Sequence, residues 1–116
     1  MYVLFIVLNG TDYLDEILAK FVDIGVRGAT ILDSQGMASA ILESQNRGIP
    51  LFGLFEALLD DSRPYNKTIF TVLESKQLVD KTVAVVQDIM KDVPRPGAGF
   101  MFTIPIDNTF VLGKPN

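Results

Sequence analysis

The sequence contains no cysteine and no histidine. The lack of cysteine excludes disulfides and thiol nucleophiles, and the lack of histidine excludes a Ser-His-Asp triad. Together the two absences exclude zinc sites built on these side chains. A general acid or base would have to be Asp, Glu, Lys or Tyr, and no convergent set of these residues is visible. We therefore expect neither an enzyme nor a metal centre, and we predict a cytoplasmic location, with which a chain free of cysteine is compatible.

Two other features are missing. No run of Lys or Arg occurs, and the formal net charge is -4, so a nucleic-acid-binding groove is not expected. No apolar run approaches the ~20 residues that a membrane span requires. The opening segment MYVLFIVL lacks a basic start and ends at Asn9-Gly10. We interpret it as a buried strand and not as a signal peptide, and we expect no membrane-spanning segment.

Apolar residues, in contrast, are abundant. Hydrophobic residues make up 48% of the 116 residues, and the mean hydropathy is +0.30. A chain of this length forms one domain with a core of its own. Its interior is too small to hide this much apolar surface. The surplus therefore indicates an oligomer.

The periodicity of the apolar residues predicts two strand–helix–strand units. The predicted elements are strands at 2–8, 28–35, 67–74 and within 97–112, and helices at 12–24 and 75–90. Thr11 or Asp12 is the expected N-cap of the first helix, Val22 is expected on its buried stripe, and Gly25 should end it. Ser75 should cap the second helix. This order is that of the ferredoxin-like βαββαβ sandwich, an α+β fold.

Such a sandwich has both helices on one face of a four-stranded antiparallel sheet, with the first and third strands in the middle. Here those two strands are apolar on both faces. One apolar face lacks a helical cover, and burying it is worth many kcal/mol at ~25 cal/mol per Å². We therefore predict an obligate oligomer that packs through its sheets.

The segment from Gly97 to Leu112 opens with two glycines one residue apart. It continues with Phe100, Phe102 and Ile104 on one side and Met101 on the other. This pattern favours a last strand buried on both faces, with a ligand-approach point at its start. Pro105 interrupts the strand, and 109–112 is expected to be extended again. From the sequence alone, turn glycines are favoured over a phosphate cradle.

Residues 37–66 are the least regular part of the chain. A short helix is expected at 37–44, and Pro50 suits the start of a second, mostly apolar helix at 51–59. We predict a helical insertion between the second and third strands. The apolar run at 51–59 most often indicates core or subunit packing, and the alternative is a surface that docks on a partner or touches a membrane.

Three stretches resemble the PII (nitrogen regulatory protein PII) signalling family. Residues 14–18 (LDEIL) are similar to its LDEV motif. Residues 24–31 (IGVRGATI), with Gly36 beyond, are similar to its GVxGMTVxEVxG segment. Residues 97–106 (GAGFMFTIPI) are similar to its GDGKIFVxPV segment. The stretches occur in the expected order and on the expected elements, so the sequence looks like a divergent member.

The resemblance implies a trimeric, non-enzymatic regulatory protein that binds adenine nucleotides in clefts between its subunits. It also implies that the segment in the place of residues 37–66 contacts a protein partner. By position, the ligand-binding residues would be Thr30, Gly36, Met37, Gly97, Gly99 and Phe100. The glycines would offer backbone N–H groups to phosphates.

The sequence departs from the family pattern at the cations. The family lysine beside the last glycine is Phe100 here, and the family arginines fall at Ser39 and near Phe110 and Leu112. These changes remove charge-assisted contacts to phosphate. The alternative function is therefore a trimeric interaction module without a ligand, which docks on its partner through the apolar 51–59 helix.

Overall fold

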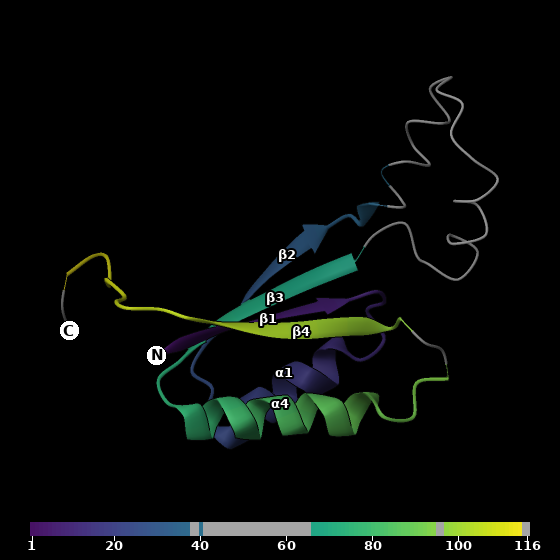
Figure 1. The fold of residues 1–116 in the computed structure, drawn as a ribbon, viewed down its shortest axis with the longest axis horizontal. Helices are drawn as coiled ribbons and strands as arrows, with labels where there is room; N and C mark the ends of the chain where they lie inside the picture. Colours follow the sequence, from purple (N-terminus) through teal and green to yellow (C-terminus); the bar gives the residue numbers. More distant parts are fainter. Residues whose placement is uncertain (38–39, 41–65, 95–96, 115–116) are drawn as a thin grey trace.

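The computed structural model describes residues 1–37, 40, 66–94 and 97–114. These residues form a βαββαβ arrangement, and its strands make one four-stranded antiparallel sheet in the order β2-β3-β1-β4 (Figure 1). The elements are β1 (Tyr2–Leu8), α1 (Leu14–Ile24), β2 (Thr30–Ser34), β3 (Asn66–Leu73), α4 (Lys76–Met90) and β4 (Gly99–Pro105). The ferredoxin-like fold is confirmed, with the first and third strands in the middle of the sheet.

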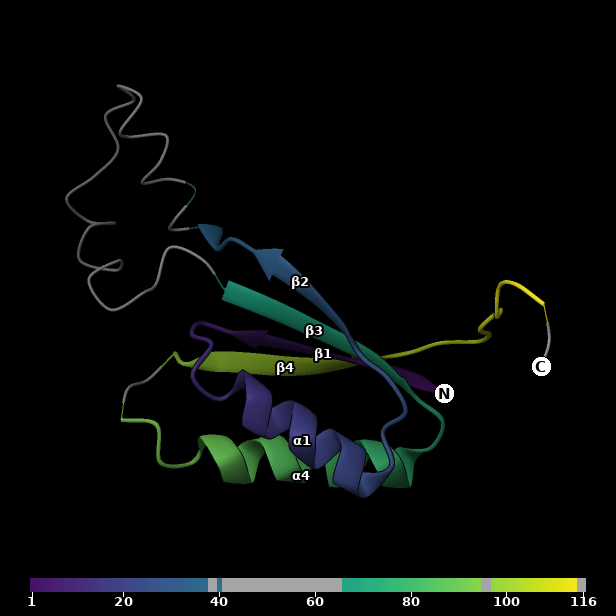
Figure 2. The same ribbon diagram turned by 180° about the vertical axis from the view of Figure 1, so that it is seen from behind.

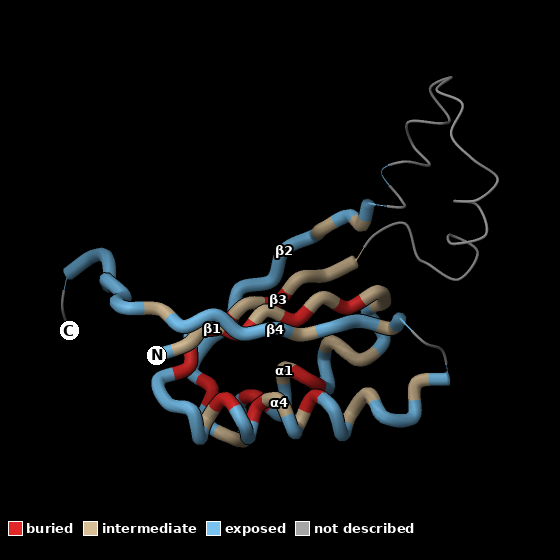
Figure 3. Tube along the Cα trace, in the orientation of Figure 1, coloured by how far each residue is buried: buried red, intermediate tan, exposed pale blue. Residues whose placement is uncertain are grey.

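Both helices lie on the same face of the sheet, which we call the inner face (Figures 1 and 2). The core lies between this face and the helices, and burial alternates along β1 as a half-covered strand requires (Figure 3). Its members come from the inward side of β1 and β3, from the facing side of the helices and, at Val26, from the connection after α1: Leu4, Ile6, Leu8, Ile17, Phe21, Val26, Ile69, Leu73, Val79 and Val86.

Local signals in the sequence explain how the helices begin and end. The Ser75 hydroxyl accepts the Leu78 backbone N–H at 3.1 Å, which confirms the predicted cap of α4. Gly25 ends α1 in the left-handed conformation with φ 92°, where glycine carries no steric cost. The buried Thr71 hydroxyl then donates to the Gly28 carbonyl at 2.5 Å and fixes the connection from α1 to β2.

Several boundaries differ from the sequence-based expectations. α1 begins at Leu14, two residues late, with Tyr13 and not Thr11 or Asp12 at the N-cap position. Val22 is exposed, because the helix core needs only a narrow stripe at Ile17 and Phe21. β2 covers only five residues, since residues before Thr30 do not pair with β3.

β4 is the largest correction. It lies at the edge of the sheet and pairs only with β1, so the prediction of a strand buried on both faces is wrong for the single chain. Phe100, Phe102 and Ile104 are 60%, 43% and 44% exposed (Figure 3). An apolar strand has the same sequence pattern whether a helix of its own chain or another chain covers it. Residues 109–112 follow β4 without joining the sheet.

The insertion predicted at 37–66 lies almost wholly outside the described residues. Met37 and Ala40 are described, and the Ala40 backbone N–H donates to the Gly36 carbonyl at 3.0 Å, as in a helical turn. The apolar helix expected at 51–59 falls outside the described part of the chain.

Candidate functional site

The face of the sheet opposite the helices, which we call the outer face, carries mostly apolar side chains. Residues paired across antiparallel strands share a face, so the register identifies its members. The apolar and aromatic members are Val3, Phe5 and Val7 of β1, Phe70 and Val72 of β3, Leu32 of β2, and Phe100, Phe102 and Ile104 of β4. Neither α1 nor α4 covers this face (Figure 2). An exposed apolar patch of this kind marks an interaction surface.

Aromatic rings form the centre of the outer face. The rings of Phe5 and Phe102 stack with centroids 4.9 Å apart, and Phe5 also lies 5.8 Å from Phe70. Phe100 extends the row, with its ring 6.1 Å from that of Phe102. The row therefore crosses from β3 through β1 to the open edge at β4, and it ends beside the glycine loop that precedes this strand.

The two positions in this loop require glycine for different structural reasons. Gly97 has φ 71°, a conformation that other residues adopt with strain. Gly99 faces the backbone of β1, and a Cβ at Gly99 would lie 2.3 Å from the Val7 carbonyl oxygen. A turn and a close approach thus account for both residues. The loop is held against β1 by the Asn9 backbone N–H, which donates to the Ala98 carbonyl at 2.9 Å.

A chain of side-chain hydrogen bonds crosses this end of the sheet. The Asn9 amide donates to the Gly97 carbonyl, and its oxygen accepts from the Asn66 amide at 3.5 Å. The Ser34 hydroxyl donates to the Asn66 side-chain oxygen and shares a 2.8 Å hydrogen bond with Thr68. The network links the glycine loop to both ends of the 37–65 segment, because Ser34 precedes that segment and Asn66 follows it.

Thr30, Gly36 and Met37 lie on the other edge strand or just beyond it. Thr30 opens β2 and pairs with Phe70 on the outer face. Gly36 lies past the end of β2, where a Cβ would meet only the Asn66 amide at 3.9 Å, and the Met37 side chain is exposed. On the inner face nearby, Lys67 forms an ion pair with Asp33. This lysine is thus already neutralised by a carboxylate.

Within one chain the structure does not bring the predicted site residues together. Thr30, Gly36 and Met37 belong to the β2 edge, whereas Gly97, Gly99 and Phe100 belong to the β4 edge, with β3 and β1 between them. Three strand spacings separate the two edges by about 14 Å. On one chain the six predicted residues therefore form two separate groups, one at each edge of the sheet.

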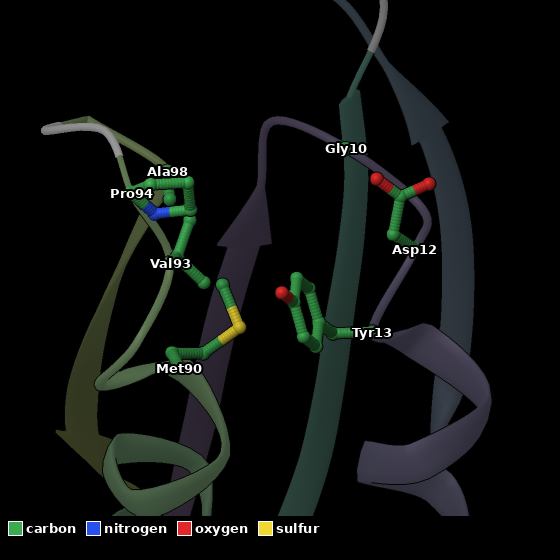
Figure 4. A pocket seen from close by; sticks show the side chains of 7 residues that line it. All are labelled: Gly10, Asp12, Tyr13, Met90, Val93, Pro94 and Ala98. Atoms are coloured by element: carbon green, nitrogen blue, oxygen red, sulfur yellow. The ribbon is translucent and has the colours of Figure 1, made fainter.

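Two hollows lie on the inner side near the glycine loop. One, of about 260 Å³, is lined by Gly10, Asp12, Tyr13, Met90, Val93, Pro94 and Ala98 (Figure 4). Figure 4 shows the Tyr13 side chain pointing across this cavity toward Met90 and Val93, with the Asp12 carboxylate at its rim. The other hollow runs between α4 and β4. The first hollow contains none of the six predicted ligand-binding residues. The second is lined in part by two of them, Gly99 and Phe100.

Sequence reasoning missed the polar network of Asn9, Ser34 and Asn66. The only signal available in the sequence was Asn9, which follows a buried strand. An asparagine at such a position indicates a turn and does not indicate a hydrogen-bond network. Among the described residues, no group of three or more Asp or Glu side chains is arranged to hold a metal ion. Nor does the described part of the chain contain a helix long and apolar enough to cross a membrane.

The comparison with solved structures addresses the fold directly. The structure of B. subtilis GlnK superimposes with a TM-score of 0.62 over 93% of this chain and 86% of GlnK. The chain has the fold of GlnK. The sequence identity is 18%. GlnK belongs to the PII family, so the resemblance carried by the three motifs is confirmed at the level of the fold.

Comparisons based on the whole sequence find no match. No family model matches the chain, and no curated protein matches its sequence. A shared fold alone does not assign a ligand or an assembly, which must be argued from the residues.

Proposed function

We propose that this protein is a non-enzymatic, PII-like regulatory protein that works as a trimer and binds a small metabolite, an adenine nucleotide, in the clefts between its subunits. The observation that carries the proposal is the placement of the predicted residues in two groups on opposite edges of one sheet. We take each group as half of an intersubunit site and call them the β2 half-site and the β4 half-site. Packing three copies through their outer faces around a common axis would bring the β2 edge of one subunit close to the β4 edge of the next.

The outer face supports the assembly. It presents the row of Phe70, Phe5 and Phe102 to solvent in the single chain. Fully burying an aromatic side chain is worth about 1.5–3 kcal/mol, and the face offers several. Cyclic association through the outer faces buries this surface in every copy at once, since each subunit presents the same patch.

The position of Phe100 supports a nucleotide site that relies less on charged side chains than the family's site does. Its ring, which stands where the family has a lysine, is 60% exposed at the mouth of the glycine loop. A flat aromatic ring stacks on a nucleobase, and removing such a ring costs ~1–3 kcal/mol of binding. The backbone of the Gly97–Gly99 loop would face the phosphates. We therefore propose that the base and not the phosphate chain supplies most of the affinity.

Thermal stability of the purified protein with adenosine, AMP, ADP, ATP, cyclic nucleotides and 2-oxoglutarate tests this function. A ligand at a hundredfold excess over its Kd stabilises by ~2.7 kcal/mol, which shifts the melting temperature by several degrees. We expect adenine compounds to produce shifts that rise little from adenosine to ATP and that Phe100→Ala reduces. No shift with any of them would favour the interaction module instead, with residues 37–66 as the partner-binding segment.

A further inference from the structure

A pocket on the helix side of the sheet lies outside the proposed nucleotide cleft. It is the hollow of about 260 Å³ shown in Figure 4, and we call it the Tyr13 pocket. Its walls come from the loop between β1 and α1, and from the end of α4 with the loop that leads to β4. None of the six predicted ligand-binding residues lines it. Because it lies on the inner side, association of copies through their outer faces would leave it accessible.

Backbone hydrogen bonds hold the two walls of the pocket in place. The Asn9 N–H donates to the Ala98 carbonyl at 2.9 Å and joins the two loops. In the turn after α4, the Val93 N–H donates to the Met90 carbonyl at 3.2 Å, which fixes two lining residues relative to each other. A pocket whose walls are already held in place loses little conformational freedom when a ligand binds.

Tyr13 is an unusual residue for the start of a helix. It stands at the N-cap position of α1 and makes no side-chain cap hydrogen bond, although the better capping residues Thr11 and Asp12 come just before it. This helix start instead places the Tyr13 side chain across the pocket, where it points toward Met90 and Val93 (Figure 4). Departures from local sequence preference are expected at functional sites.

The lining determines which ligands the pocket suits. The wall from α4 and its loop presents the apolar side chains of Met90, Val93, Pro94 and Ala98. The Tyr13 ring faces this wall, and the Asp12 carboxylate lies at the rim (Figure 4). Asp12 is the only charged residue among the described lining residues. An ammonium group is attracted both to a carboxylate and to an aromatic ring. A carboxylate accepts several hydrogen bonds, so Asp12 can bind an ammonium group in addition to a partner within the chain.

The size of the pocket suits a small molecule. A cavity of about 150 Å³ is enough to bind benzene, so the Tyr13 pocket has room for a ring or a short aliphatic chain with one further group. We propose that it binds a small organic amine, with the apolar body against Tyr13 and Met90 and the ammonium group at the rim beside the Asp12 carboxylate. The pocket is formed within one chain. The inference therefore goes beyond the proposed function and rests neither on trimer formation nor on nucleotide binding.

Binding of phenethylamine and butylamine at millimolar concentration tests the inference. Calorimetric titration gives the affinity, and NMR of the backbone amides gives the place of binding. Each amine is compared with its neutral alcohol, 2-phenylethanol or 1-butanol, which has the same apolar body. The amines should shift the amide signals of Gly10, Tyr13 and Ala98. They should bind about tenfold more tightly than the alcohols, because only an ammonium group forms a charge-assisted hydrogen bond with the carboxylate.

A matched pair of variants tests the role of Asp12. Asp12→Asn keeps the size of the side chain and removes its charge, so it should weaken amine binding about tenfold and leave the alcohols unaffected. Asp23→Asn is the control, since it changes the net charge of the chain by the same amount. Asp23 lies exposed near the C-terminal end of α1, whereas Asp12 precedes the start of that helix. Asp23→Asn should leave amine binding unchanged.

Several results would overturn the inference. They are equal affinities for the amines and their alcohols, equal losses in Asp12→Asn and Asp23→Asn, amide shifts that leave Tyr13 and Ala98 unaffected, and no binding of either amine. Adenosine titrated into the same samples separates the two proposals. Adenosine binding without amine binding removes only the Tyr13 pocket as a site, whereas amine binding without adenosine binding removes only the nucleotide site.

Discussion

The Phe5 and Phe102 rings lie stacked on neighbouring strands, with centroids 4.9 Å apart and ring planes inclined by 12°. They belong to the central strand β1 and the edge strand β4, on the face that neither helix covers. Offset-stacked rings are worth about 0.5–1.5 kcal/mol beyond their area. In an assembled trimer the pair would lie in the subunit interface, so its integrity should determine the oligomeric state.

Phe102→Asp should therefore dissociate the protein. A carboxylate in an apolar interface loses its hydration without gaining a partner. Light scattering should show the mass falling from about three times the 12.8 kDa of one chain to that of a single chain. Val22→Asp is the matched control, since Val22 is exposed on α1 and lies away from the outer face. An unchanged mass for Phe102→Asp would show that copies do not pack through this face.

Gly99→Ala should destabilise the fold because the new Cβ would lie 2.3 Å from the Val7 carbonyl oxygen. The β1–β4 pairing must shift to make room, at a cost of about 1–3 kcal/mol. Gly28→Ala is the control, since a Cβ there meets nothing within 4 Å. Urea denaturation measures both variants. Equal stability of Gly99→Ala and the natural protein would mean that β4 does not approach β1 as closely as described.

Asn9→Ala should loosen the glycine loop. The Asn9 side chain donates to the Gly97 carbonyl and accepts from Asn66, and each lost hydrogen bond costs about 0.5–1.5 kcal/mol. Hydrogen exchange should become faster at Gly97–Gly99 and at Asn66 together. Asn108→Ala, at an exposed position beyond the end of β4, serves as the control. Faster exchange at only one of the two places would show that the network does not connect them.

Ser75→Ala should cost about 1 kcal/mol, because it removes the hydroxyl that accepts the Leu78 backbone N–H at the start of α4. Gln77→Ala, at an exposed position in the first turn of the same helix, should change stability far less. Thermal unfolding compares the two variants. A smaller loss for Ser75→Ala than for Gln77→Ala would contradict the capping geometry.

The sequence predicted the fold well where its patterns are local. Alternation along β1 and the stripe at Ile17 and Phe21 reflect burial against helices of the same chain, and Ser75 and Gly25 act on their own helix ends. The exposure of β4 in the single chain was not predictable. A strand face that another chain covers has the same apolar pattern as one that lies inside the core. For Gly99 the sequence favoured a turn glycine, whereas the structure shows that the Val7 carbonyl oxygen leaves no room for a Cβ.

The candidate site was predictable only in part, for a related reason. The motifs suggested the residues, but their separation onto the β2 and β4 edges follows from the strand order. Asn9 and Asn66 are far apart in sequence and meet only because β1 and β3 pair in this register. Whether the six residues form a site thus depends on how copies pack, which no local pattern encodes.

A binding experiment with mixed subunits tests most directly whether the site forms only between packed copies. Gly36→Asp alters the β2 half-site where a Cβ meets only the Asn66 amide, and Phe100→Ala removes the exposed ring of the β4 half-site without placing a charge on the outer face. Each variant alone should lose the adenine-nucleotide binding of the natural protein. Trimers formed from an equal mixture should regain about a quarter of the clefts, since each mixed trimer has one cleft made of two unaltered edges. Calorimetric titration that finds this recovery supports a site between subunits, and a mixture that binds no better than either variant would contradict it.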